Sequence, residues 1–132
     1  MPKTILVADD EAGIRDTLRR LLEYEKYRVV LAEDGKAALE KADGEVVDLV
    51  LLDIKMPGMD GMEVLTHLHK SRPDLPVVII SGHGTIQTAV EATRLGAFDF
   101  IEKPIDADRI LLVIRNGLEK GKLLRENISL RQ

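Results

Sequence analysis

Three aspartates and a lysine stand after short apolar runs of this 132-residue sequence. Asp9 and Asp10 come directly after one run, Asp53 closes a second, and Lys103 follows shortly after a third. A buried parallel strand is typically a continuous apolar run, and ligands of an open α/β sheet bind beyond the carboxyl ends of its strands. If the three runs are parallel strands, the four charged groups share one pocket.

The net charge of this group indicates what it would bind. Two carboxylates about 5 Å apart repel by roughly 3 kcal/mol at an effective dielectric constant near 20, so three in one cleft need positive charge. Lys103 supplies one charge, and a divalent cation is the natural second. An all-oxygen site without His or Cys suits Mg²⁺ better than Zn²⁺. The alternative, in which Asp9 and Asp10 cap a helix and Asp53 begins a turn, explains each residue alone but not the whole set.

Two loops extend the predicted site. The segment 55–61, Lys-Met-Pro-Gly-Met-Asp-Gly, is rich in turn residues and can expose Asp53 while directing backbone groups at a ligand. Ser81 follows another apolar run and precedes Gly82-His83-Gly84, which leaves room for close approach of the backbone. We therefore expect the Ser81 hydroxyl to face the same cleft.

The elements that must position these residues follow from hydrophobic periodicity. Short apolar runs alternate with segments of helical spacing, which indicates consecutive βαβ units and a parallel sheet. The helix predicted over 11–25 has the clearest apolar face, whereas the helix over 85–95 has a thin one, made of Ile86, Ala89 and Val90, and should be weakly held. The predicted strands are residues 4–8, 28–32, 49–52, 77–80 and 98–101.

The last predicted helix starts at Asp106, a suitable N-cap residue, and continues past the point where one domain would be covered. Leucines and an isoleucine keep helical spacing up to residue 130. We therefore expect a domain over residues 1–118 and, over 119–132, the start of a helical linker that forms a coiled-coil dimer element. The alternative is a frayed tail.

Composition restricts the function further. The net charge is −4, but residues 109–132 carry six Lys or Arg against two Glu, so residues 1–108 carry −8. An acidic body, and a mildly basic tail without aromatic residues, argue against direct nucleic-acid binding. There is no cysteine for a disulfide, and no apolar run approaches the roughly 20 residues that span a bilayer. We expect a cytoplasmic protein without a signal peptide or membrane contact.

The charged residues and their neighbours match a known family. Asp9-Asp10, the segment Leu-Leu-Asp-Ile-Lys-Met-Pro-Gly-Met-Asp-Gly over 51–61, Ser81, and Phe-Ile-Glu-Lys-Pro over 100–104 resemble the receiver domain of two-component response regulators over about residues 3–118. The segments 81–92 and 95–104 further resemble NtrC-type receivers, which precede a AAA+ ATPase that activates sigma-54 transcription. The resemblance implies a CheY-like, flavodoxin-like fold: a doubly wound five-stranded parallel sheet of strand order 2-1-3-4-5 with an extended C-terminal helix.

The resemblance also implies a role for each acidic residue. Asp53 would be the phosphoacceptor, attacking the phosphorus of a phosphohistidine on a sensor histidine kinase. Asp10 and Asp53 would bind Mg²⁺ with the backbone carbonyl of Lys55, and Asp9 would assist through water. Such a module is not a separate enzyme, although it catalyses its own phosphoryl transfer and slow dephosphorylation.

The remaining roles concern switching. By resemblance, Lys103 would pair with phosphoryl oxygens, Ser81 would move toward them, and Phe100 would turn inward, shifting the face formed by the fourth helix, fifth strand and fifth helix. Lys55 and His83 would tune hydrolysis of the acyl phosphate. The partners implied are the kinase, an output domain of the AAA+ type, and a second copy bound through the fourth and fifth helices and the linker. The peptide before Pro104 is cis in the family.

Rival classes fit the residues less well. A haloacid-dehalogenase-like phosphatase also uses a strand-end aspartate and Mg²⁺, but it needs a second carboxylate two residues on, where this chain has Lys55. A flavodoxin-like cofactor binder must hold a flavin phosphate in its first loop, which Asp9, Asp10 and Glu11 would repel. A stand-alone receiver, and a receiver-like domain that is never phosphorylated, remain alternatives.

Overall fold

The computed structural model describes residues 2–82 and 84–131, which form five strands and five helices in strict alternation. The strands are β1 (Thr4–Ala8), β2 (Arg28–Ala32), β3 (Leu49–Asp53), β4 (Val77–Ser81) and β5 (Asp99–Glu102). The helices are α1 (Ala12–Tyr24), α2 (Gly35–Gly44), α3 (Gly61–Ser71), α4 (Ile86–Arg94) and α5 (Ala107–Arg131).

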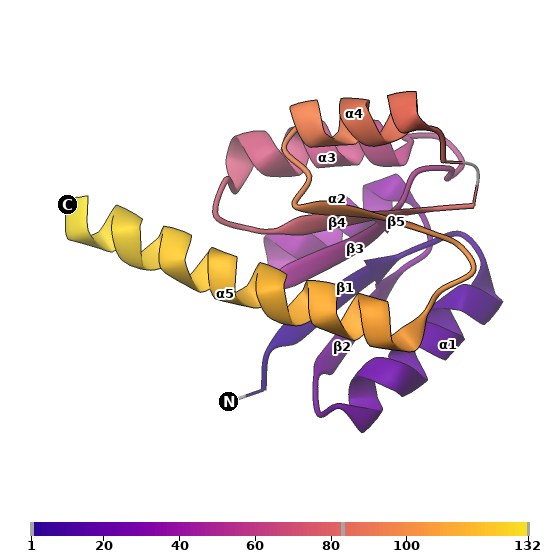
Figure 1. Ribbon diagram of the computed structural model, residues 1–132, viewed down its shortest axis with the longest axis horizontal. Coiled ribbons are helices and arrows are strands. Elements are labelled where there is room, and N and C mark those ends of the chain that lie inside the picture. Colours follow the sequence, from indigo (N-terminus) through magenta and orange to yellow (C-terminus); the bar gives the residue numbers. More distant parts are fainter. Residues whose placement is uncertain (1, 83, 132) are drawn as a thin grey trace.

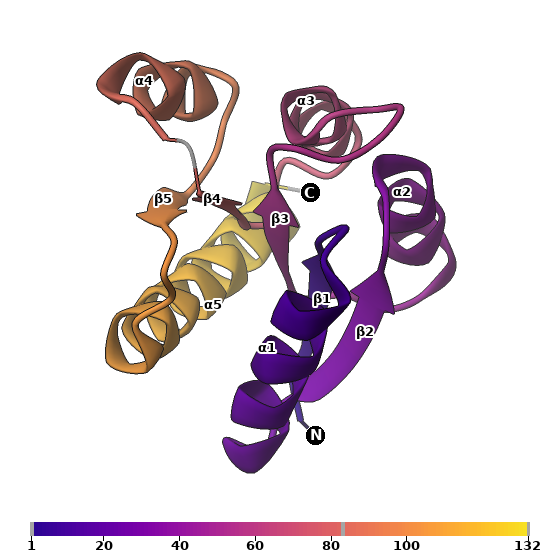
Figure 2. The same ribbon diagram turned by 90° about the vertical axis from the view of Figure 1, so that its right-hand side faces the viewer.

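All strands are parallel, in the order β2-β1-β3-β4-β5, which confirms the predicted doubly wound sheet. Helices α2, α3 and α4 cover one face of the sheet and α1 and α5 the other (Figures 1 and 2). The order changes direction beside β1, where β2 lies on one side and β3 on the other. In an open α/β sheet, the carboxyl ends of the strands at such a switch point form the ligand crevice.

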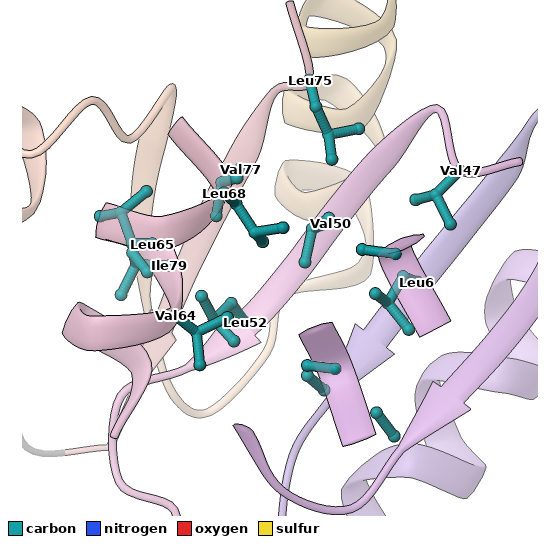
Figure 3. Packing of buried hydrophobic residues seen from close by; sticks show 14 of the residues in the cluster. Leu6, Val47, Val50, Leu52, Val64, Leu65, Leu68, Leu75, Val77 and Ile79 are labelled. Carbon is teal, nitrogen blue, oxygen red and sulfur yellow. The ribbon is translucent and has the colours of Figure 1, made fainter. Parts of the chain in front are cut away.

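The two faces of the sheet have separate apolar cores. Along β1, Leu6 and Ala8 belong to the cluster under α2, α3 and α4, while Ile5 and Val7 belong to the cluster under α1 and α5. Figure 3 shows side chains of the first cluster, among them residues of β1, β3, β4 and α3 and the loop residues Val47 and Leu75. The three inner strands β1, β3 and β4 are buried at every residue, which explains why they are recognisable in the sequence as continuous apolar runs. The outer strands β2 and β5 are only partly buried.

Helix ends follow the capping rules at most positions. Asp34, Asp60 and Thr85 accept hydrogen bonds from backbone N–H groups in the first turns of α2, α3 and α4. Asp106 accepts in the same way from the N–H of Asp108 at 3.0 Å, as predicted for the start of α5. These caps help to fix where α2, α3, α4 and α5 begin.

Helix α4 differs from the sequence prediction in the face it buries. Ile86 and Val90 are 85% and 52% exposed, so these two residues of the predicted apolar face point to solvent, while the third, Ala89, is half-buried. Ala92 is the residue of α4 that is fully buried. Leu95 and Ala97, after the helix, pack against the same cluster as Ala92. The helix is therefore held mainly at its C-terminal end. Strand β5 also begins one residue later than predicted.

Helix α5 is continuous from the domain body to Arg131 and projects beyond it (Figure 1). Gly117 is buried, with Leu49 and Phe98 next to it, and Gly121 is buried beside Pro76. The Lys120 ammonium lies 5.6 Å from the centre of the Phe98 ring. Contact with the body thus continues to about residue 121. Within residues 2–82 and 84–131, no helix has the length and apolar character needed to cross a membrane.

Candidate functional site

The register of the sheet brings the acidic residues together. Ala8 pairs with Leu52, so Asp9 and Asp53 each follow the same rung of the β1–β3 pair. One carboxylate oxygen from each of Asp9, Asp10 and Asp53 lies within 4.8 Å of the others. Asp9 and Asp53 are buried and Asp10 is exposed. The predicted acidic cluster therefore forms at the switch point of the sheet.

Lys103 reaches this cluster from β5. Ser81 pairs with Glu102 in the β4–β5 register, and the Lys103 N–H donates to the Ser81 carbonyl at 2.8 Å. The Lys103 ammonium lies 3.0 Å from Asp9 Oδ2 and 3.6 Å from Asp53 Oδ2, and its side chain is only 14% exposed. The peptide between Lys103 and Pro104 is cis, as the resemblance implied. The structure thus brings together the lysine and the three aspartates.

The burial and the charges of the cluster shift the pKa of Asp53 upward. Burial, with 4% of the residue exposed, is the main cause that raises this pKa to about 6, and the charge of Asp9 adds to it. Lys103 and a backbone hydrogen bond from Lys55 act in the opposite direction. For Lys103, burial disfavours the charged form, but its hydrogen bond to Asp9 and the nearby charges leave its pKa raised. The cluster still has an excess of carboxylates.

This excess suits a bound cation. The donors are carboxylate oxygens close enough to share one ion, and within residues 2–82 and 84–131 the group includes no His or Cys. Such a set matches hard divalent cations, with Mg²⁺ preferring one or two carboxylates and several waters. The residues present therefore fit the cation that the sequence predicted.

The loop after β3 is tightly held beneath the cluster. The Gly61 N–H donates to the Ile54 carbonyl at 2.7 Å, and a Cβ on Gly61 would stand 2.2 Å from the Asp53 carbonyl oxygen. Only glycine fits this close approach between the start of α3 and the end of β3. The Lys55 side chain is exposed. This loop therefore fixes the backbone on which Asp53 stands.

The two predicted switch residues lie on neighbouring strands. Ser81 ends β4 and is buried, while Phe100 on β5 is half-buried and packs against the cluster under α2, α3 and α4. A Cβ on Gly84 would come within 2.7 Å of the Phe100 ring, so the ring lies directly against the loop before α4. His83 lies outside the described residues.

Two contacts of the site were not predicted from the sequence. Glu11 Oε1 lies 3.5 Å from the Lys103 ammonium. Arg15 on α1 donates to the Asp9 carbonyl at 2.7 Å. Glu11 adjoins the two aspartates in the sequence, so its place near them was predictable. Nothing in the pattern of α1 distinguishes Arg15 from Arg19 and Arg20.

The fold and the acidic cluster together define a flavodoxin-like α/β domain with a candidate cation site at the carboxyl ends of β1 and β3. Residues 5–115 match the family model described as "Response regulator receiver domain". The chain belongs to this family, as its motifs suggested.

Similar proteins indicate to which subgroup of receiver domains this chain is related. The chain is 42% identical, over its whole length, to the nitrogen assimilation regulatory protein NtrX of Azorhizobium caulinodans. It is 40% identical over 96% of its length to the C4-dicarboxylate transport transcriptional regulatory protein DctD of Pseudomonas aeruginosa. It spans 30% and 28% of these two proteins. The predicted likeness to NtrC-type receivers is thereby confirmed.

A solved structure agrees with this assignment. NtrX from Brucella abortus in complex with ATP superposes with a TM-score of 0.90 at 47% identity, covering 98% of this chain and 30% of that protein.

Proposed function

We propose that this chain is a phosphorylation-controlled switch of a two-component system, with Asp53 as the acceptor of a phosphoryl group from a sensor histidine kinase. An Asp53 carboxylate oxygen attacks phosphorus and forms the new oxygen–phosphorus bond. The phosphorus–nitrogen bond of the phosphohistidine breaks, and the imidazole nitrogen keeps the electron pair. The observation that carries this proposal is the meeting of Asp53 with two further aspartates and Lys103 at one sheet edge.

Phosphoryl transfer requires positioning of the phosphoryl group and neutralisation of its charge, and we assign these roles to the other residues of the site. Asp10 and Asp53, with the backbone carbonyl of Lys55, would hold Mg²⁺, and Asp9 acts through water. When bound, Mg²⁺ supplies positive charge to the phosphoryl oxygens. Lys103, already between Asp9 and Asp53, pairs with one of those oxygens.

Ser81 and Phe100 transmit the change. The Ser81 hydroxyl moves to a phosphoryl oxygen, and the Phe100 ring, which lies against the loop at Gly84, moves into the space it leaves. Helix α4 responds because Ile86 and Val90 leave its N-terminal half without apolar anchoring. A weakly held element needs only a small difference in contact energy to change position. Lys55 and His83 tune access of water to the acyl phosphate.

The switched face, made of α4, β5 and α5, then controls an output domain and binds a second copy together with the linker over 119–132. We propose an output domain of the AAA+ type that activates sigma-54 transcription. Two findings support it: the chain spans 30% of NtrX from Azorhizobium caulinodans, and NtrX from Brucella abortus binds ATP in its solved complex. We further propose that the protein works in the cytoplasm, where a phosphorylated kinase domain would meet it.

The direct test is phosphorylation by acetyl phosphate with Mg²⁺, followed by intact mass spectrometry. We expect the mass of one added phosphoryl group, lost in Asp53→Asn and kept in Asp43→Asn, which removes an exposed carboxylate on α2. Amide NMR shifts on adding beryllofluoride should spread from Asp53 to α4 and β5. If labelling persisted in Asp53→Asn, the acceptor would be another residue; if the wild type took no label, the proposal would be wrong.

A further inference from the structure

Lys103 has a carboxylate partner outside the acidic cluster. Besides Asp9 and Asp53, its ammonium lies 3.5 Å from Glu11 Oε1. The oxygens close enough to share one ion come from Asp9, Asp10 and Asp53, and Glu11 is not in that group. Glu11 therefore contacts the lysine without adding to the candidate cation site.

The local structure explains why this carboxylate is available. Glu11 occupies the N-cap position of α1, yet its side chain makes no capping hydrogen bond. Its backbone N–H donates to Asp9 Oδ1 at 2.9 Å, which fixes Glu11 beside the cluster. A side-chain acceptor at the N-cap commonly binds the first free N–H groups of the helix. Here the carboxylate is directed at Lys103 instead.

Exposure places Glu11 at the entrance of the site. Its side chain is 64% exposed, whereas that of Lys103 is 14% exposed and that of Asp9 only 2%. An ammonium group has three N–H donors, and three carboxylates surround this one. A phosphoryl group on Asp53 would add acceptor oxygens beside the same donors. Glu11 would then compete for Lys103, and its negative charge would oppose an approaching anion.

We propose that Glu11 is a positioning residue that holds Lys103 toward the entrance and sets the rate at which anionic phosphoryl donors react with Asp53. This inference rests on the proposed phosphoryl transfer. Removing the Glu11 charge releases Lys103 for the incoming phosphoryl oxygens and weakens repulsion of the donor. The effect depends on donor charge, so it is larger for a dianionic donor than for a monoanionic one, and it declines as salt screens exposed charges.

The test compares Glu11→Gln with the wild type and with Glu33→Gln, which removes an exposed carboxylate just after β2 at the same edge of the sheet. Rates of labelling are measured with acetyl phosphate, a dianion at neutral pH, and with phosphoramidate, a monoanion. The phosphorus–oxygen or phosphorus–nitrogen bond breaks, and acetate or ammonia leaves. We expect Glu11→Gln to react roughly two- to fivefold faster with acetyl phosphate at low salt, as suits an exposed ion pair.

The gain should be smaller with phosphoramidate and should shrink at high salt, while Glu33→Gln stays close to the wild type. Equal acceleration with both donors would indicate a general structural effect and overturn the proposal, as would unchanged rates in Glu11→Gln. A thermal unfolding curve for each variant verifies folding. Failure of the wild type to take any label would instead refute the proposed function.

Discussion

At the scale of single residues, the fold places the Asp53 carboxyl group where its ionised form is disfavoured. It is buried next to Asp9, and only Lys103 among its described neighbours in the cluster supplies an opposing charge. A carboxylate in this position is reactive toward electrophilic phosphorus once a cation and the lysine balance the charge. The same arrangement should reduce the stability of the folded chain.

The stability effect can be measured through Asp53→Asn in metal-free buffer. The pKa of Asp53 is about 6 in the folded chain, against an ordinary value of 3.8. Between these pH values the folded state binds more protons than the unfolded state, so this group makes stability fall as pH rises from about 4 to about 6. Asparagine removes the effect, and we expect the variant to gain roughly 1 to 3 kcal/mol of unfolding free energy at pH 7.

Urea unfolding at several pH values tests this prediction. The difference between Asp53→Asn and the wild type should be smallest near pH 4, grow up to about pH 6 and then level off. A difference that stays constant from pH 4 to pH 7 would contradict the argument, because it would not follow the charge on Asp53. Asp43→Asn, in an exposed position on α2, is the matched control and should change little.

Substituting Lys103 allows the phosphorylation of Asp53 to be separated from the structural change in α4. In Lys103→Met, Asp53 keeps its place and the three aspartates can still bind a cation, so we expect partial labelling by acetyl phosphate. The phosphoryl group then lacks its link to β5, and beryllofluoride should no longer shift the amide signals of α4. Lys36→Met, exposed on α2, is the control. Normal shifts throughout α4 in Lys103→Met would show that the lysine has no part in switching.

At the scale of elements, glycines show where the site constrains the backbone. A Cβ on Gly61 would stand 2.2 Å from the Asp53 carbonyl oxygen and 2.7 Å from Ile54 Cα, whereas a Cβ on Gly13 of α1 has nothing within 4 Å. Gly61→Ala should therefore lower unfolding free energy by about 1 to 3 kcal/mol, since backbone atoms must move. Gly13→Ala should raise it by about 0.4 to 1 kcal/mol.

Chemical denaturation gives both values, and amide NMR reports the displacement of Asp53 in Gly61→Ala. We expect that variant also to be labelled more slowly, because the nucleophile has moved. Equal stability changes in the two variants would mean that the approach between α3 and β3 has no special energetic importance.

The elements also show what the sequence could and could not predict. The inner strands were predictable because burial on both faces makes them continuous apolar runs, and β1 was placed to the residue. The prediction of the buried face of α4 was wrong for Ile86 and Val90. These two residues have the spacing of an amphipathic helix, but periodicity does not say whether that face contacts the sheet or the solvent. The contact between Glu11 and Lys103 joins the ends of β1 and β5, and only the register of intervening strands brings them together.

At the scale of the whole molecule, α5 connects the site to anything beyond the domain. It begins after the loop that carries Lys103 and Pro104, crosses the sheet face opposite α3, and projects past the body (Figures 1 and 2). Leu112 and Leu123 are exposed and eleven residues apart, which is about three helical turns, so they lie on one face of α5. This face spans both the body and the projecting part.

The proposed dimer can therefore be tested on the face of α5 defined by Leu112 and Leu123. Leu123 is 55% exposed, and a carboxylate at this position would have to be buried in any helix pair formed there. We expect Leu123→Glu to weaken self-association at least tenfold in sedimentation velocity, since burying an unpaired charge costs more than 1.4 kcal/mol. Lys122→Glu introduces the same carboxylate about 100° around the helix and should weaken it less. Equal association of the wild type and Leu123→Glu, with and without beryllofluoride, would exclude this face of α5 from the dimer and leave α4 and β5 as the surface through which phosphorylation of Asp53 is read.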